Sequence, residues 1–217
     1  MRNAFLGEAI TIPENMQQHA SVINLVDMLD FSRVKFEKVI TLSSKKIADV
    51  KSKWTLKPLE QIIAKVIGNI TKIPKKEILL TGKNPVVTQE QDKIISGYTN
   101  NSNLITDLPL IVFGDHSCTV KYMDIPFVRG ADGTQLIKLA PNSGVELKFL
   151  CEFLKNCDIP NKNKYERHFK HLKTLKIPLP PPEVQQKIIN ECEAIDNDMT
   201  LSMQSTSLKQ AVMQKYL

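Results

Sequence analysis

The chain has 217 residues, 42% of them hydrophobic, and a formal net charge of +6 at pH 7. This composition predicts a folded protein of one or two modest domains, and the positive charge favours a polyanionic partner. No stretch approaches the roughly 20 apolar residues of a membrane-spanning helix, and the N-terminus lacks a signal peptide's apolar region, so we expect a cytoplasmic protein without a membrane partner.

Residues 1–50 are predicted to form a helical N-terminal extension that ends in a linker. Four apolar residues recur there at helical spacing, namely Val22, Ile23, Val26 and Leu29. The polar and basic stretch Ser43–Lys53 is typical of a linker between folded units. We therefore place the start of the main domain at residue 51.

The main domain, residues 51–178, is predicted to open with a short helix and to continue as strands. The segment Trp54–Gly68 carries apolar residues at helical spacing and ends at a glycine. From Lys72 onward, short apolar segments broken by turn residues predict strands. These segments are Gly82–Gln89, as a loop that leads into a strand, and Leu108–Gly114, Lys121–Val128 and Thr134–Leu139.

Turns and a second helix complete the domain. Ser96–Asn103 is predicted to be a turn-rich loop, and Arg129–Gly133 a hairpin-type turn between the last two strands. Val145–Leu154 has the pattern of an amphipathic helix. The fold class is therefore α+β, with one globular domain of short mixed or antiparallel strands and small helices.

Residues 179–217 are predicted to form a proline joint and a long C-terminal helix. Pro178–Pro182 includes four prolines, which exclude a helix interior or a central strand and favour a stiff polyproline segment. Pro182 suits a first helical position, and Glu183 places a carboxylate on the positive end of the helix dipole. The helix then carries one apolar stripe, made of Val184, Ile188, Cys192, Ile195, Met199, Leu208 and Val212.

Such a stripe needs a partner. The sequence leaves three open: another copy of the chain, a second half of a larger chain, or the Val22–Leu29 helix.

Positive charge is concentrated in the middle of the chain. Lys45–Lys83 contains ten lysines against Asp49, Glu60 and Glu77. Asn161–Lys176 is also basic, with only Glu166 opposing six lysines and arginines, whereas the first half of the C-terminal helix is acidic. A polyanion is therefore expected to bind the main domain and not the helix.

Basic residues interleaved with neutral polar residues in loops suit DNA, because lysine and arginine neutralise phosphates while amides and hydroxyls bond to base edges or the backbone. The candidate DNA-binding residues are Lys83, Thr88, Tyr98, Thr99, Asn100, Asn101, His116, Ser117, Lys121 and Arg129, although a solvated loop position explains each of them at least equally well.

Catalytic motifs are missing, so we expect no catalytic residue, metal or cofactor in this chain. Neither the D/N-P-P-Y/F motif of an adenine methyltransferase nor a P-loop occurs. Asp132, Glu146 and Lys148 match the D…E-x-K pattern of a metal-dependent nuclease, an alternative that we rank well below a turn and a helix start. The pair His168 and His171 lacks a third ligand, and the four cysteines are expected to be reduced and buried.

The order of several short motifs resembles the DNA specificity subunits of type I restriction–modification systems. The motifs are GKNPV, GYT, LPLIVFGDH, FVRGADG, RHFK and IPLPP, and they extend over roughly Trp54–Ile188. The segment Tyr165–Ile188 is similar to the end of a target recognition domain, and in that family a phrase such as IPLPPLEEQ opens the spacer helix.

The resemblance implies a non-catalytic half-subunit with one target recognition domain and one spacer helix, which forms a homodimer through Glu183–Leu217. It implies sequence-specific recognition of double-stranded DNA, a palindromic site if two copies pair symmetrically, an adenine methyltransferase subunit that binds S-adenosylmethionine, and a restriction subunit that uses ATP and Mg²⁺. AFLGEA and the segment after it resemble the junction of a fused adenine methyltransferase, so a piece of such an enzyme is one alternative. A helical interaction protein with no nucleic-acid role is another.

Overall fold

The computed structural model describes residues 52–68, 70–131, 133–157, 159, 167–198 and 205–217. The chain divides into two compact units, Met1–Ser44 and Lys45–Leu217, and the described residues all belong to the second. The predicted helical extension over residues 1–50 therefore lies outside the described residues, as do Asp132 and Met199.

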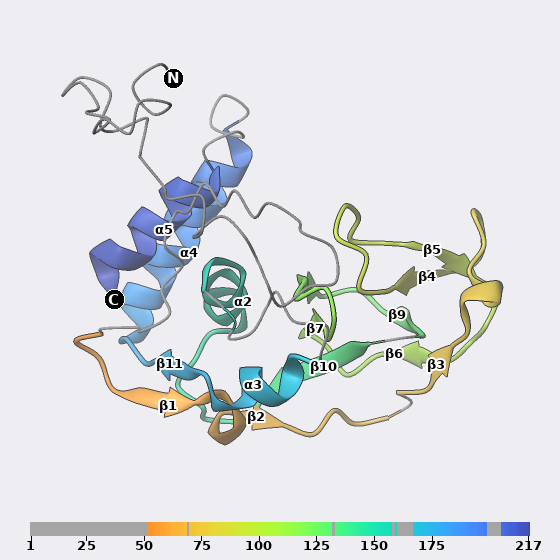
Figure 1. Cartoon of the computed structure of the whole chain (residues 1–217), viewed down its shortest axis with the longest axis horizontal. Coiled ribbons are helices and arrows are strands. Elements are labelled where there is room, and N and C mark those ends of the chain that lie inside the picture. Colours follow the sequence, from red (N-terminus) through yellow and green to blue (C-terminus); the bar gives the residue numbers. More distant parts are fainter. Residues whose placement is uncertain (1–51, 69, 132, 158, 160–166, 199–204) are drawn as a thin grey trace, which may run out of the picture. The chain divides into compact units, whose positions relative to one another are not determined.

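The described unit contains eleven strands, four α-helices and two short 3-10 helices (Figure 1). The strands are β1 Leu56–Pro58, β2 Ile63–Ala64, β3 Lys72–Ile73, β4 Asn84–Val87, β5 Gly97–Thr99, β6 Leu104–Ile105, β7 Leu110–Gly114, β8 Val120–Met123, β9 Phe127–Gly130, β10 Thr134–Leu139 and β11 Lys176–Pro178. The helices are η3 Leu59–Gln61, η4 Lys75–Glu77, α2 Leu147–Asn156, α3 Phe169–Thr174, α4 Pro182–Asn197 and α5 Ser205–Tyr216.

The strands form three sheets, which confirms the predicted α+β class. One sheet has the antiparallel order β2-β10-β7-β8. The second has the order β3-β9-β4-β5 with β6 also on β9, and it is mixed because β3 and β4 run parallel to β9. The third is the pair β1 and β11. In Figure 1 the mixed sheet lies at the opposite end from α4 and α5.

Strand β7 connects the two parts of the core because its side chains alternate between its two faces. Ile111 and Phe113 belong to the larger apolar cluster, which also contains α2, whereas Leu110 and Val112 belong to a smaller cluster with Val87 and Phe127. All five residues of β7 are buried. The strand is thus held from both sides, and the turn that follows Gly114 is presented from a rigid element.

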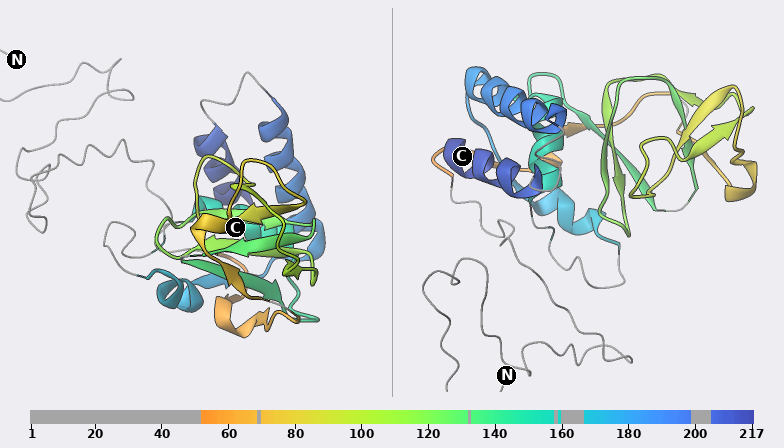
Figure 2. Two further views of the ribbon diagram at one scale, coloured as in Figure 1. Left: turned by 90° about the vertical axis from the view of Figure 1, so that its right-hand side faces the viewer. Right: turned by 90° about the horizontal axis from the view of Figure 1, so that it is seen from above.

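The C-terminal region is helical, and Pro182 is its first helical residue as predicted. The region forms two helices and not one long helix. Two ion pairs show that α5 runs antiparallel to α4: Lys209 with Asp196 at 2.6 Å, and Lys215 with Glu191 at 2.9 Å. Figure 2 shows the two helices side by side, with α2 between them and the sheets.

Because α5 folds back along α4, the apolar stripe predicted for the C-terminal helix is covered within the chain. Ile188, Cys192 and Val212 are buried in the main core, and Val184 and Ile195 pack against it. Leu208 is half-buried. The stripe contacts the chain's own α2 and α5, because folding back removes apolar surface that a lone helix would leave in water.

The proline joint is fastened to the domain by Gln185. Its side-chain N–H groups donate to the carbonyls of Pro180 at 2.8 Å and Gly144 at 2.7 Å, and its oxygen accepts from the N–H of Glu146 at 2.7 Å. Gln185 is almost completely buried. These bonds set the direction in which α4 leaves the domain.

Three local predictions were wrong, each because strand pairing differs from the local pattern. The segment Trp54–Gly68 forms β1, η3 and β2 and not a helix, since β1 pairs with β11 and β2 with β10. The GYT motif, predicted as loop, is strand β5. Arg129–Gly133 does not close a hairpin, because β9 and β10 belong to different sheets.

Lys121–Val128 is two strands, separated by a break that contains Pro126. Predictions of a strand at β4, β7 and β10 and of a helix near α2 were confirmed. Within the described ranges, no helix is both long and apolar enough to cross a membrane.

Candidate nucleic-acid interface

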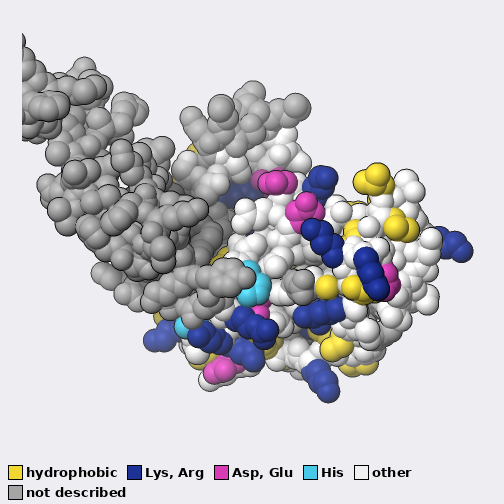
Figure 3. Space-filling view, turned by 45° about the vertical axis from the view of Figure 1, so that its right-hand side comes forward, with side chains coloured by type: hydrophobic (Ala, Val, Ile, Leu, Met, Phe, Trp, Pro, Cys, Tyr) yellow, Lys and Arg dark blue, Asp and Glu magenta, His cyan; other side chains and the backbone are white. Residues whose placement is uncertain are grey.

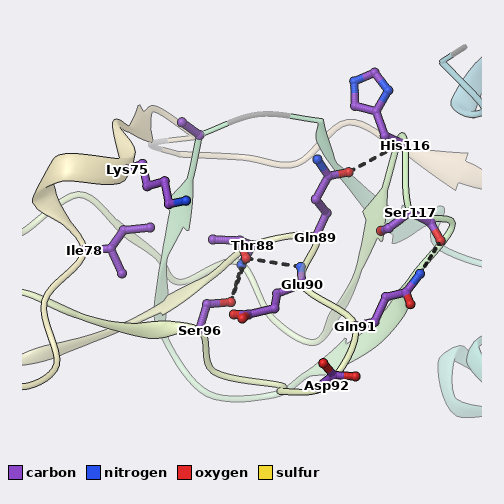
Figure 4. A pocket seen from close by; sticks show the side chains of 11 residues that line it. Lys75, Ile78, Thr88, Gln89, Glu90, Gln91, Asp92, Ser96, His116 and Ser117 are labelled. Atoms are coloured by element: carbon purple, nitrogen blue, oxygen red, sulfur yellow. Dashed lines mark hydrogen bonds between the residues drawn. The ribbon is translucent and has the colours of Figure 1, made fainter. Parts of the chain in front are cut away.

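A hollow of about 800 Å³ opens at the end of β4 and β7 (Figure 4). Most of its lining side chains are polar. They come from η4 and the residue after it, from the loop between β4 and β5, and from the turn after β7. The lining residues are Lys75, Ile78, Thr88, Gln89, Glu90, Gln91, Asp92, Ser96, His116, Ser117 and Ala131.

The loop on one side of the hollow is closed at its base by hydrogen bonds. The Thr88 and Ser96 hydroxyls lie 2.7 Å apart, and the N–H of Thr88 donates to the Ser96 hydroxyl at 3.2 Å. The N–H of Ser96 donates to the carbonyl of Val86 at 2.8 Å. These bonds give the loop a defined shape although it contains no helix or strand.

The turn after β7 is joined to this loop. The Gln89 side-chain oxygen accepts from the N–H of His116 at 3.1 Å, and the Gln91 side chain donates to the carbonyl of Ser117 at 3.3 Å. A Cβ at Gly133, whose φ is +67°, would lie 2.7 Å from the His116 ring. Glycine is therefore required where the chain passes under this turn.

The same turn is tied to the basic segment that precedes the proline joint. Asp115 is buried, and its carboxylate accepts from the N–H of Phe169 at 2.8 Å and from the Gln135 side chain at 3.1 Å. The carbonyl of Asp115 accepts from the N–H of His168 at 2.9 Å. The exposed side chains of Arg167, Lys170 and Lys173 belong to the segment that is held in this way.

Seven of the ten predicted DNA-binding residues have side chains at least partly exposed, and the structure places them in two groups. Thr88, His116 and Ser117 line the hollow. Lys83, Tyr98, Asn100 and Asn101 lie at the β4–β5 edge. Within this edge the Asn100 side chain accepts from the N–H of Lys83 at 3.3 Å, and the Asn101 side chain donates to Glu77 at 3.2 Å.

The other three, Thr99, Lys121 and Arg129, are buried and bond to groups inside the domain. Arg129 donates to the hydroxyl of Thr134 at 3.1 Å and also to its carbonyl, and Lys121 donates to the carbonyl of Ile94 at 3.4 Å. Burial lowers the pKa of both Lys121 and Arg129. We therefore leave these three residues out of the proposed surface.

Sequence reasoning missed Gln89, Gln91, Ser96 and Lys75. The run Thr88–Asp92 directly after β4 is polar without a break, and this was the available signal. Glutamine amides can both donate and accept, which suits the edge of adenine, and the Glu90 and Asp92 carboxylates can accept from cytosine.

Basic side chains lie on the elements that form this polar hollow. Lys75, which lines it, and Lys76 are exposed on η4, and Lys93 is exposed in the loop between β4 and β5. Lys83 is exposed at the other end of β4. Figure 3 shows lysine and arginine side chains distributed over this side of the domain, with hydrophobic and a few acidic side chains among them. The arrangement offers positive charge to phosphates and hydrogen-bonding groups to bases.

The nuclease alternative gains no support from the residues that the structure describes. Asp132 lies outside them. Lys148 forms an ion pair with Glu193 of α4 at 2.8 Å, and the backbone of Glu146 bonds to Gln185. The described part of the chain holds no group of three or more His, Cys, Asp or Glu residues placed to bind a metal ion.

Comparison with known proteins identifies one family. The sequence model described as "Type I restriction modification DNA specificity domain" matches residues 51–210. No curated protein gives a sequence match.

Similar solved structures include a type I restriction–modification system S subunit from M. genitalium. It is 20% identical with a TM-score of 0.50, and the match covers 69% of this chain and 40% of that chain. The HsdS subunit from Thermoanaerobacter tengcongensis is 17% identical with a TM-score of 0.49, and the match covers 78% of this chain and 46% of that one. The chain thus spans less than half the length of these subunits.

Proposed function

Because the chain belongs to the family of type I restriction modification DNA specificity domains, we propose that its globular domain binds double-stranded DNA and recognises the base sequence. The observation that carries this proposal is the polar hollow with the lysines on the elements that form it. Phosphate contacts position a protein on DNA, whereas contacts to base edges select the sequence, and the domain presents groups suited to each.

The groups suited to phosphates and the groups suited to base edges lie at different positions in the domain. Lys75, Lys76 and Lys83 on one side, and Lys170 and Lys173 on α3, are exposed and lie on short, anchored elements. The amides of Gln89 and Gln91 line the hollow, held by bonds to the turn after β7. DNA whose backbone contacts the lysines would place base edges against the amides.

We propose that the chain is the non-catalytic component of a larger assembly. Family membership supports an adenine methyltransferase subunit and a restriction subunit as partners, with S-adenosylmethionine, ATP and Mg²⁺ bound by them and not by this chain. We place this assembly in the cytoplasm.

Pairing of two copies through the C-terminal helices is also a proposal, because two copies would supply two recognition domains. The apolar stripe of α4 is already covered within one chain, so a pair would use the outer faces of α4 and α5 or exchange α5 between copies. A mass of twice 24.6 kDa by light scattering would support pairing. A coding region that runs from a methyltransferase into Met1 would instead favour the fused enzyme.

The decisive experiment measures DNA binding as a function of salt. The full chain is mixed with a pool of short duplexes whose central segment is randomised, and the retained DNA is sequenced. We expect an enriched motif, and binding to it that weakens steeply as salt rises because counterions are released. Retention without any enriched sequence, or with no salt dependence, would refute the proposal. Cleavage of plasmid by the chain alone with Mg²⁺, abolished by Glu146→Ala, would revive the nuclease alternative.

A further inference from the structure

A second feature of the domain, an exposed apolar side chain, is also suited to contact DNA bases. Leu80 is 95% exposed and lies between η4 and β4, with Leu79 and Tyr98 also exposed beside it at 45% and 38%. Single exposed leucines are common on protein surfaces and do not by themselves indicate a binding site. The surroundings of Leu80 make this one different.

The segment that carries Leu80, residues 79–83, is held rigidly and is named here the Leu80 tip. The N–H of Leu79 donates to the carbonyl of Tyr98 at 2.7 Å, and the N–H of Tyr98 donates back at 2.9 Å. A Cβ at Gly82 would lie 2.9 Å from the N of Thr99, and one at Gly97 would lie 2.6 Å from the Ile78 side chain. Both glycines let the tip pack directly on β5, and Leu80 projects from this support.

The Leu80 tip is flanked by positive charge. Lys75 and Lys76 precede it in η4, Lys83 ends it, and all three are exposed. The carboxylate in this stretch, Glu77, accepts a hydrogen bond from Asn101 at 3.2 Å. A polyanion drawn to these lysines would meet an apolar side chain between its contacts.

The tip also adjoins the hollow, because Lys75 and Ile78 line it. Figure 3 shows hydrophobic side chains beside lysines and arginines at this end of the domain. DNA offers apolar partners of two kinds, the thymine methyl group in the major groove and the face of an unstacked base.

We propose that Leu80 contacts bases and contributes to sequence selection, an inference that rests on the proposed DNA binding. The lysines around it would hold the backbone, and the leucine would favour a thymine or an easily unstacked base step. A protein partner with a carboxylate-rich surface is the competing occupant, and the adjoining hollow favours DNA over it.

The test compares the wild-type chain with Leu80→Asn, and with Ile67→Asn as the matched control. Ile67 is 78% exposed but lies after β2, away from the tip. Both substitutions are at exposed positions, and circular dichroism checks that both variants fold. Each protein selects from the same randomised duplex pool, and the affinity for the wild-type motif is then measured by fluorescence anisotropy.

We expect Leu80→Asn to lose the preference at one position or two adjacent positions of the motif, with the rest unchanged. It should bind the wild-type motif roughly tenfold more weakly, as for the loss of one base contact, while binding to unselected duplex and the behaviour of Ile67→Asn stay as in the wild type. Uracil in place of thymine at the affected position separates the two contacts. If the wild-type chain binds the uracil duplex as weakly as Leu80→Asn binds the original motif, Leu80 contacts the thymine methyl group. If its affinity is unchanged, Leu80 contacts the face of a base.

Two results would overturn the inference, and they are distinguishable. If Leu80→Asn selects the wild-type motif with wild-type affinity, Leu80 has no base contact although the domain still reads DNA. Loss of co-purification with an adenine methyltransferase subunit in that variant would then assign the tip to a protein partner. If the wild-type chain selects no motif, the proposed function fails and this inference fails with it.

Discussion

The carboxylate of Asp115, at the end of β7, accepts a hydrogen bond at 2.8 Å from the backbone N–H of Phe169, 54 residues later in the chain. The bond joins the GDH turn, which lines the hollow, to the RHFK segment, which carries exposed basic side chains. A conspicuous acidic residue beside a candidate DNA surface is thus a structural support. It holds together two elements of the proposed DNA surface.

Replacing Asp115 by alanine should lower the free energy of unfolding by about 1–3 kcal/mol, because the Phe169 N–H and the Gln135 amide lose a buried acceptor. Urea denaturation measures the change. Asp124→Ala, at an exposed carboxylate after β8, is the control and should stay within about 0.5 kcal/mol of the wild type. Equal denaturation midpoints for the two variants would show that the Asp115 bonds contribute nothing.

Lys83→Gln should weaken binding to all duplexes to a similar degree and reduce the slope of log affinity against log salt by about 1, because one phosphate contact is lost. Anisotropy titrations over a salt series give the slope. Lys57→Gln is the matched control, since Lys57 is also exposed but lies on β1, at the opposite end from β4 (Figure 1). An unchanged slope for Lys83→Gln would remove this residue from the interface.

Local sequence signals predicted those elements whose cause is local. Pro182 at the first helical position, the buried strand β7 and the amphipathic helix α2 follow from proline chemistry, a short apolar run and helical spacing. The segment Trp54–Gly68 has helical spacing as well, but β1 pairs with β11, which lies about 120 residues along the chain. Pairing at such a distance leaves no mark in a short window, so the helix prediction failed.

Prediction of the candidate site from the sequence was also limited by contacts between residues far apart in the chain. Lys121 and Arg129 have the residue types of a DNA surface, yet both are buried and bond to backbone or hydroxyl oxygens of the domain. Gln89 and Gln91 were not predicted, because a polar run indicates a loop but not which of its side chains line a hollow. Their position in the hollow depends on the turn after β7, which the fold brings against them from about 27 residues away.

Gln185→Ala should destabilise the domain by about 1–3 kcal/mol, because its removal leaves the N–H of Glu146 and two carbonyls without a buried partner. Gln186→Ala is a closely matched control. The Gln186 side chain is exposed and bonds only to Asn190 among the interactions described, so a change within about 0.5 kcal/mol is expected there. If urea midpoints fall equally in both variants, Gln185 does not fasten the joint.

Lys209→Ala should be more damaging than Lys215→Ala, although both remove a lysine from α5 that is ion-paired with α4. Lys209 is buried and contacts Glu152 at 2.9 Å and Asp196 at 2.6 Å, whereas Lys215 is exposed and pairs with Glu191. Loss of Lys209 leaves the mostly buried Glu152 carboxylate with Lys155 as its remaining cation, which should cost about 1–3 kcal/mol, whereas an exposed pair contributes about 0–1 kcal/mol. Thermal unfolding compares the two, and equal losses would argue that α5 does not pack as described.

Asp107 makes the free energy of unfolding of the domain depend on pH in the acid range. The hydrogen bond from Lys138, at 2.7 Å, and then that from the Ile67 N–H, at 2.9 Å, lower the pKa of Asp107 below its ordinary value. A lowered folded-state pKa stabilises the protein fully above the unfolded pKa of about 3.9, and this contribution is lost as pH falls through the folded value.

Asp107→Asn should therefore be less stable than the wild type at pH 7, and the difference should shrink as pH falls below about 4. Urea unfolding at a series of pH values measures it, with Asp124→Asn as a control for removing one negative charge from an exposed position. The loss of charge alone would affect both variants alike. A gap between Asp107→Asn and the wild type that stays constant down to acid pH would show that the Lys138 pair is not coupled to folding, because a titrating carboxylate must give up its contribution once protonated.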